Sequence, residues 1–414
     1  MNPLRERAFA RLWVASLFAE TAEWMLQVAL PVFIFTATGS ASSTAVTMVA
    51  GLVPMVLVSP VAGVLADRWN RRVLLAAVCF TQAAVSLPLL AVGEGRLTVV
   101  YLVMVAQSMV ASVYEPTRSA LVPALVGEDR LTAANGLMGM NSSVARLAGA
   151  SLGGAVLGFA GLGWVVGVYL SLLVVAGLML VPKFAQQQGK PGGEPGPLWR
   201  AWLDGLADIR RDRRLRTVWW ALVPLSVGQG MFAVLFVVFV TRTLGGGEAE
   251  VGLLRGVQAI GGLAAGLCLA SLARRARPAK LLGWGIVAFG VCAAVIWNAV
   301  YVSTSFPVYV VLFIVVGVPA VMLNAGLVSV VQLAAPPERA GRALSSMFAG
   351  AAVCQVAGTL GAGAAVGWAS PAVLLNAQAV FSVVAAFVVL LGLRTRSVTN
   401  VEACPVSSPP VTST

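Results

Sequence analysis

Long apolar runs that recur along almost the whole chain are the feature that most limits how it can fold. Each run is about 20 residues long, which is the length of helix that crosses the hydrocarbon core of a bilayer. Only 11% of the 414 residues are charged and 59% are hydrophobic, whereas a soluble domain carries about 25% charged residues. The runs are continuous and do not alternate with period two, which argues against a transmembrane barrel. The sequence therefore predicts an all-α polytopic membrane protein.

Twelve membrane-spanning helices can be placed on these runs. Their predicted ranges are 11–36, 44–66, 73–92, 97–117, 134–157, 163–182, 217–241, 251–272, 281–301, 307–333, 343–366 and 372–393. The longest predicted loop, 183–216, divides the chain into one six-helix bundle at 1–182 and another at 217–393. Apolar residues at helical spacing within this loop predict an amphipathic helix on the membrane surface. The polar tail at 394–414 is predicted to be disordered.

The positive charges predict the orientation of these helices. With both termini cytoplasmic, all but four of the 28 lysines and arginines lie on the cytoplasmic side, with Arg11 and Arg118 counted at that membrane interface. The exceptions are Arg96 and Arg242 on the outside, and Arg146 and Arg255 within spans. Because basic residues collect in cytoplasmic loops, the net charge of +12 indicates orientation in a bilayer, and we expect no nucleic-acid partner. The prediction is a multi-pass, monomeric protein of the inner (cytoplasmic) membrane.

The types of residue present also limit the chemistry. The chain has no histidine and five cysteines, four of them inside predicted helices. The sequence contains no metal-ligand spacing, no phosphate-binding loop and no cysteine–histidine nucleophile pair. We therefore expect no metal, no cofactor, no disulfide framework and no enzymatic activity.

The two halves of the chain repeat each other weakly. Leu65-Ala66 and Leu74-Leu75 match Leu272-Ala273 and Leu281-Leu282 at a shift of 207 residues. At a shift of 209, Ala148-Gly149 matches Ala357-Gly358, Arg146 matches Gln355, and Gly154 and Gly158 match Gly363 and Gly367. A parallel duplication of six spans is the plan of transporters whose halves rock about a central cavity.

A charged loop between the second and third spans carries the most specific motif. Its residues are Gly63, Asp67, Arg68, Arg71 and Arg72, in the pattern Gly-x-x-x-Asp-Arg-x-Asn-Arg-Arg. This pattern resembles the signature loop of the major facilitator superfamily, Gly-x-x-x-Asp-Arg-x-Gly-Arg-Arg. The one departure is Asn70, which we expect to keep a left-handed turn because asparagine tolerates that backbone.

Three further segments make the resemblance closest to the branch of macrolide-efflux proteins and enterobactin exporters. They are Val28–Pro31, Glu115–Pro123 and Ala134–Leu137. The resemblance implies the major facilitator fold of two pseudo-symmetric six-helix bundles, and transport by alternating access. It also implies that Asp67 acts as a conformational switch against the start of the eleventh span, near Arg342.

Charged residues predicted to lie within the bilayer suggest a coupling site. Glu20 and Glu23 share one face of the first span, and Glu23 and Arg146 both lie about 12 residues, or roughly 18 Å, into their helices. We therefore expect Arg146 to pair with Glu20 or Glu23, which leaves the other carboxylate free to bind a proton. A purely structural ion pair is the alternative interpretation. Glu115 is expected to pair locally with Arg118 near the cytoplasmic end.

The fifth span carries Gly149-Ala-Ser-Leu-Gly-Gly154, which resembles the drug-antiporter motif Gly-Pro-x-x-Gly-Gly without its proline. Such glycines also permit close helix contacts, and this structural interpretation is retained beside the functional one. Polar residues on other spans are candidates for the substrate cavity. These candidates are Gln27, Gln107, Glu115, Gln229, Asn324 and Gln355.

The function predicted from these residues is secondary active export of a small lipophilic or amphipathic compound, such as a drug, antibiotic or siderophore-like molecule, in exchange for protons. An uptake permease or an uncoupled facilitator on the same fold is the first alternative, because the sequence does not show the direction of transport. A non-transporting membrane scaffold is the second, although it would not need Glu20, Glu23 and Arg146 within the bilayer.

Overall fold

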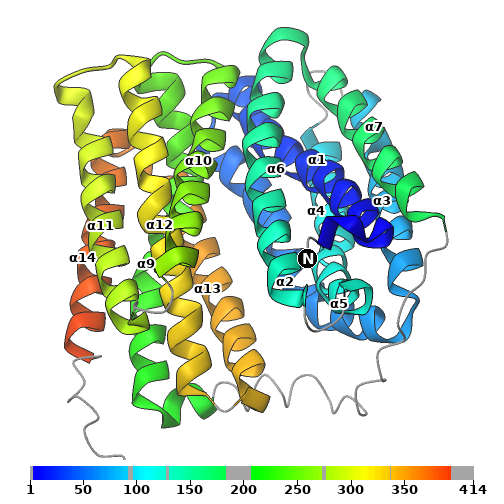
Figure 1. Ribbon diagram of the computed structural model, residues 1–414. Helices are drawn as coiled ribbons and strands as arrows, with labels where there is room; N and C mark the ends of the chain where they lie inside the picture. The colour runs from blue at the N-terminus through cyan, green and yellow to red at the C-terminus, as the bar shows by residue number, and fades with distance from the viewer. Residues whose placement is uncertain are drawn as a thin grey trace, which may run out of the picture.

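The computed structural model describes residues 3–91, 97–126, 130–182, 207–272, 277–335 and 337–392. Within these ranges it leaves out the side chains of residues 59–64, 66–68, 132, 270–272 and 337–342. The described chain is built from helices joined by short turns (Figure 1). Most of the loop at 183–216, the tail at 394–414 and Arg96 lie outside the described residues.

The first group of helices comprises α1 (Arg7–Thr38), α2 (Ala41–Arg68), α3 (Arg71–Ser86), α4 (Leu97–Ala111), α5 (Tyr114–Val126), α6 (Leu131–Ala160) and α7 (Leu162–Leu180). The second group comprises α9 (Arg213–Val238), α10 (Glu248–Leu272), α11 (Pro278–Asn298), α12 (Phe306–Ala334), α13 (Pro337–Ala365) and α14 (Pro371–Gly392). Short turns extend several of them, namely η1 (Pro3–Arg5), η2 (Leu87–Ala91), η5 (Ala299–Tyr301) and the π-helical η4 (Phe239–Thr243).

Among the described residues, 12 helical segments are long and apolar enough to cross a membrane. This confirms the predicted all-α polytopic fold. The predicted ranges differ mainly at their ends, because several helices continue beyond their apolar runs. The side chains of α12 and α14 illustrate the environment, since many of their valines and leucines are exposed, as lipid-facing residues are.

The fourth span is longer than predicted and consists of two helices. The predicted range ended at residue 117, whereas α4 and α5 together reach Val126. The helix breaks at Ser112 and Val113, where Pro116 lacks the N–H that would bond to Ser112 and its ring crowds that carbonyl. Helix then resumes, since proline is tolerated in a first turn. Arg118 therefore lies inside the span, and the prediction that it lies at the membrane interface is wrong.

The loop between α2 and α3 differs from the expectation in one respect. Asn70 does not adopt a left-handed backbone, since its φ is −62°. Its side chain instead accepts hydrogen bonds from the backbone N–H groups of Arg72 and Val73, as an N-cap of α3. Arg71 donates to the carbonyl of Ala120 at 3.0 Å, and Arg72 donates to carbonyls at the end of α7. The side chains of Gly63, Asp67, Arg68 and Arg342 lie outside the described residues.

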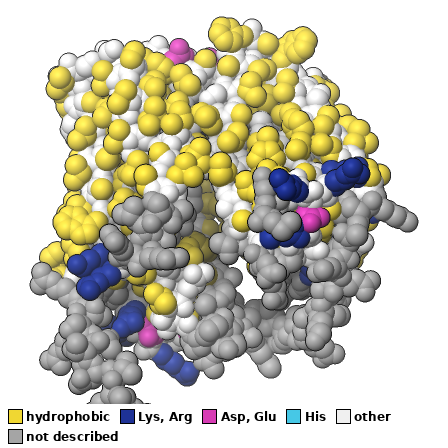
Figure 2. All heavy atoms as spheres, in the orientation of Figure 1, with side chains coloured by type: hydrophobic (Ala, Val, Ile, Leu, Met, Phe, Trp, Pro, Cys, Tyr) yellow, Lys and Arg dark blue, Asp and Glu magenta, His cyan; other side chains and the backbone are white. Residues whose placement is uncertain are grey.

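The two groups of helices stand side by side in Figure 1, with α6 and α2 of the first group beside α10 and α13 of the second. Hydrophobic side chains cover much of the upper part of the face shown in Figure 2, and the coloured basic side chains lie in its middle and lower part. We call the end of the bundle where α1 begins and α2 finishes the basic end. The other end of the bundle is called the opposite end.

Candidate substrate and coupling site

Three cavities follow one another between the two groups of helices. The vestibule, of about 990 Å³, lies toward the basic end and is lined by Glu20, Arg118 and residues 345–355 of α13 among others. The inner cavity, of about 280 Å³, shares Glu23, Gln27 and Gln355 with the vestibule. The arginine cavity, of about 200 Å³, is lined by Arg146 and Arg255, and it shares Arg255 with the inner cavity. Polar groups are thus arranged along one path through the apolar spans.

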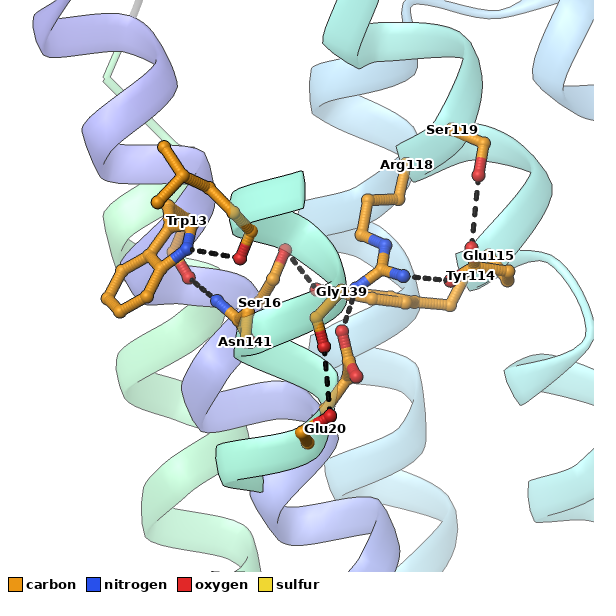
Figure 3. Close-up of polar contacts among 11 residues, drawn as sticks. Trp13, Ser16, Glu20, Tyr114, Glu115, Arg118, Ser119, Gly139 and Asn141 are labelled. Atoms are coloured by element: carbon orange, nitrogen blue, oxygen red, sulfur yellow. Dashed lines mark hydrogen bonds and ion pairs between the residues drawn. The ribbon is translucent and has the colours of Figure 1, made fainter. Parts of the chain in front are cut away.

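A cluster of three charged residues, two of them nearly buried, lies beside the vestibule (Figure 3). Arg118 on α5 forms ion pairs with Glu20 on α1 and, at 2.6 Å, with Glu115 one turn before it. The side chains of Arg118 and Glu20 are only 9% and 12% exposed, whereas that of Glu115 is 63% exposed. The prediction of a local Glu115–Arg118 pair is confirmed. The predicted pairing of Glu20 with Arg146 is wrong, because Glu20 pairs with Arg118 instead.

Hydrogen bonds on either side hold this charged cluster in place. The indole of Trp13 donates to the carbonyl of Leu137 at 3.0 Å, and Asn141 donates to the carbonyl of Trp13 at 2.5 Å. Tyr114 lies 3.3 Å from the hydroxyl of Ser16. Figure 3 shows these contacts tying α1 to α5 and α6. The cluster therefore belongs to a rigid part of one half, and Glu20 has a structural partner.

Glu23 has no arginine partner among the described side chains. Its carboxylate accepts a hydrogen bond of 3.2 Å from the side chain of Gln27, one turn along α1. Glu23 lines both the vestibule and the inner cavity. It forms no ion pair with Arg146, so this part of the prediction is also wrong. Of the two acids on the first span, Glu20 thus pairs with an arginine and Glu23 with an amide.

Arg146 and Arg255 hold positive charge at the inner end of the path. The guanidinium of Arg146 lies 5.8 Å from the ring centre of Trp24, and that of Arg255 lies 4.9 Å from the ring centre of Phe232. A Cβ added at Gly262 would lie 3.4 Å from Arg146 Nη2, so the arginine reaches across from α6 to α10. Counting residues into a helix predicted the depth of Arg146 but not this direction. Arg255 was recognised only as lying within a span.

Most of the predicted polar residues line the cavities. Gln27, Gln107 and Gln355 line the inner cavity, Gln229 lines the arginine cavity, and Glu115 lines the vestibule. Gln107 also donates to the hydroxyl of Tyr169. The exception is Asn324, which is exposed on α12 and belongs to none of the three cavities. Its neighbour Leu323 faces Gly285 of α11, which turns Asn324 away from that contact.

The glycines of the fifth span make close helix contacts on two sides. A Cβ added at Gly149 would lie 2.3 Å from the carbonyl oxygen of Thr21 on α1, and one at Gly153 would lie 2.5 Å from that of Met25. A Cβ at Gly154 would lie 2.7 Å from the Cα of Gly252 on α10. These glycines are therefore needed for backbone approach, which is the structural interpretation of the motif.

The same contacts recur in the second half at the positions that the repeat predicts. Gly358 is the counterpart of Gly149, and a Cβ added there would lie 2.1 Å from the carbonyl oxygen of Val227 on α9. Gly363, the counterpart of Gly154, faces Ala41 and Ala45 at the start of α2. The halves are thus joined twice by equivalent crossings, α6 on α10 and α13 on α2. Both crossings lie toward the opposite end.

Two hydrogen bonds reinforce the contact between the halves at this end. Arg242, just beyond α9, donates to the carbonyl of Gly39 at 2.7 Å, and its guanidinium lies 5.4 Å from the ring centre of Phe35. Ser42 donates to the carbonyl of Gly363 at 2.9 Å. The halves are therefore joined at the opposite end, while the vestibule separates them toward the basic end.

Twelve spans in two related halves, with polar cavities between them, define a transporter of the major facilitator class. A family model described as transmembrane secretion effector matches residues 1–412. The chain belongs to this family of the major facilitator superfamily. No curated protein matches it in sequence.

Solved structures of transporters share the fold at low sequence identity. The nucleoside transporter NupG, solved as a mutant, has a TM-score of 0.76 at 14% identity, covering 93% of this chain and 100% of its own. A bacterial homologue of the iron transporter ferroportin in its inward-facing state has a TM-score of 0.70 at 18% identity, covering 93% and 98%. The same homologue in its outward-facing state has a TM-score of 0.61, with the same identity and coverage.

Proposed function

We propose that the protein is a proton-coupled exporter of amphipathic organic compounds in the inner (cytoplasmic) membrane, with both termini in the cytoplasm. The observation that carries this proposal is Glu23, a carboxyl group within the spans that lines the inner cavity and has no arginine partner among the described residues. Burial of an acid without a cation favours its neutral form. A substrate that brings a positive or strongly polar group to Glu23 would displace its proton.

The conformation supports alternating access. The halves meet at the opposite end through the glycine crossings, and the vestibule lies toward the basic end. The better match to the inward-facing than to the outward-facing state of the ferroportin homologue, 0.70 against 0.61, agrees with an inward-facing state. In that state Glu23 would face the cytoplasm and could take up substrate there.

The composition of the cavities supports an amphipathic substrate. Methionines and aliphatic side chains, including Met48, Met55 and Met104, line the inner cavity beside Glu23 and the glutamines. Unbranched, flexible methionines suit ligands of varied shape. The family description and the resemblance to macrolide-efflux and enterobactin exporters favour export. An uptake permease on the same fold is the second candidate, since the unpaired charges of Arg146 and Arg255 would also suit a polar nutrient.

The direct test is proton release by purified protein on adding lipophilic amines in weakly buffered detergent. Wild type and Glu20→Gln are expected to release protons, because Glu20 is already paired with Arg118. Glu23→Gln is expected to bind the amine without release. Glu248→Gln, at the start of α10 at the opposite end, serves as the control and should behave as wild type. Binding without proton release by the wild type would overturn the coupling mechanism.

A further inference from the structure

Arg146 and Arg255 line one cavity within the spans, and neither forms an ion pair with an acidic side chain that the structure describes. The Nε of Arg146 is buried and has no hydrogen-bond partner in the described part of the chain. Placing one arginine within a membrane is costly, and two like charges in one cavity repel each other. Neither guanidinium can lose its proton to relieve this cost. The arrangement therefore calls for a negative group supplied from elsewhere.

We propose that Arg146 and Arg255 together bind an oxyanion of the transported molecule, so that preferred substrates are zwitterionic amphiphiles. Such a substrate has an apolar or aromatic body, a carboxylate or similar oxyanion in the arginine cavity, and a basic amine at Glu23. This inference rests on the proposed function, because it assigns the substrate of the same cavities.

The geometry of the two arginines suits an oxyanion. Each guanidinium lies against an aromatic ring, Arg146 on Trp24 and Arg255 on Phe232. A guanidinium over a ring can still donate hydrogen bonds from the N–H groups at its edge. Carboxylates and related oxyanions match this edge with two parallel hydrogen bonds. A halide or a neutral carbonyl would use fewer of the donors.

The rest of the arginine cavity suits an aromatic or apolar body. Its lining includes Trp24, Phe232, Phe289, Trp297 and Phe313. Gln229, Gln258 and Gln378 add amide groups, which bind neutral polar atoms without changing the charge. A small inorganic anion would leave these rings without contacts, so the oxyanion is expected to be part of a larger molecule.

The path through the cavities accounts for the amine. Arg255 lines the arginine cavity and the inner cavity, and Glu23 lines the inner cavity as well. One elongated molecule can therefore meet positive charge at one end and Glu23 at the other. The amine would compete with a proton for Glu23, as exchange requires. A substrate with only an oxyanion would repel the ionised form of Glu23 and would cause proton uptake instead.

The test uses six pairs of aromatic amino-carboxylic acids and their methyl esters, spanning one to three rings. Binding to wild-type protein in neutral-lipid nanodiscs is measured by equilibrium dialysis, and proton release by a pH indicator. For the pair that binds most tightly, we expect the acid to bind at least about 10-fold more tightly than its ester, as expected for lost charge-assisted hydrogen bonds. We expect the preference to fall below about 3-fold in Arg146→Gln/Arg255→Gln, while proton release persists.

Neutralising these arginines leaves no described carboxylate without its partner, so the double variant should fold, which size-exclusion chromatography checks. Arg146→Lys/Arg255→Lys keeps the charge and should keep part of the preference. Arg214→Gln, which changes an exposed arginine at the start of α9, is the matched control and should keep all of the preference.

Equal binding of acid and ester with proton release, or a preference unchanged in the glutamine double variant, overturns this inference alone. Acid preference without proton release supports it and overturns the coupling. Failure of every pair to bind overturns both.

Discussion

The ion pair between Arg118 and Glu20 allows a quantitative prediction about stability. Both side chains are nearly buried, at 9% and 12% exposure. Removing one partner leaves the other as an uncompensated buried charge, which in proteins costs 3–5 kcal/mol. Water in the vestibule beside Glu20 lowers this cost, so we expect Arg118→Gln to reduce the free energy of unfolding by about 3 kcal/mol.

The second arm of the cluster should matter much less. Glu115 pairs with the same guanidinium but is 63% exposed, and exposed ion pairs contribute between about 0.2 and 1 kcal/mol. Glu115→Gln is therefore expected to cost less than about 1 kcal/mol. Glu20→Gln should cost more, because it leaves the buried Arg118 with only its exposed partner. The double variant Glu20→Gln/Arg118→Gln should lose less stability than Arg118→Gln alone, because neither charge is then stranded.

The measurement is unfolding in mixed micelles with a rising mole fraction of sodium dodecyl sulfate, followed by circular dichroism. The four proteins of the double-mutant cycle and Glu115→Gln are compared in the same detergent and at the same pH. A non-additive cycle, with the double variant more stable than Arg118→Gln, is the expected result. Losses that simply add, or a loss in Glu115→Gln equal to that in Glu20→Gln, would refute the burial argument.

Two further predictions concern the joined end of the molecule. In Gly154→Val, the added Cβ would lie 2.7 Å from the Cα of Gly252, so the opposite end should fail to close and transport should fall at least 10-fold. A Cβ added at Gly158 meets only ordinary contacts at 3.6 Å. The control Gly158→Ala should therefore transport normally. In Arg242→Gln, loss of the 2.7 Å bond to the carbonyl of Gly39 should raise the reactivity of a cysteine placed at residue 39 toward a membrane-impermeant maleimide. Unchanged labelling would show that the bond from Arg242 is not needed to keep this end closed.

The spans could be predicted from the sequence because run length depends directly on bilayer thickness. The repeat predicted that Gly149 and Gly358 are equivalent, and each faces the first helix of its own half. The continuation of the fourth span past Pro116 could not be predicted, because its later residues are less apolar than the rest of the span. That continuation placed Arg118 beside Glu20.

The sequence predicted which charged residues belong to the site better than it predicted which of them pair with one another. Counting residues along a helix gives the depth of a side chain, and it correctly placed Glu20, Glu23 and Arg146 within the bundle. Depth does not give the direction around the helix axis, and this direction decided that Arg146 faces α10. Arg255 was recognised as lying within a span but was not predicted to line the cavity. At the repeat shift of 207 residues, Arg255 corresponds to Met48. Both residues line the inner cavity, so the repeat was the signal that could have drawn attention to Arg255.

The two glycine crossings have a mechanical consequence. At the closest contacts of α6 with α10 and of α13 with α2, the atoms that meet belong to backbone and small side chains, namely Gly154 against Gly252 and Gly363 against Ala45. Where side chains of two helices interleave, rotation of one helix on the other requires several side chains to change rotamer together. Where only backbone and small side chains meet, the helices can change their crossing angle while the distance between them stays the same. In the proposed alternating access, the two crossings would therefore be the contacts that let the halves turn with few changes of rotamer.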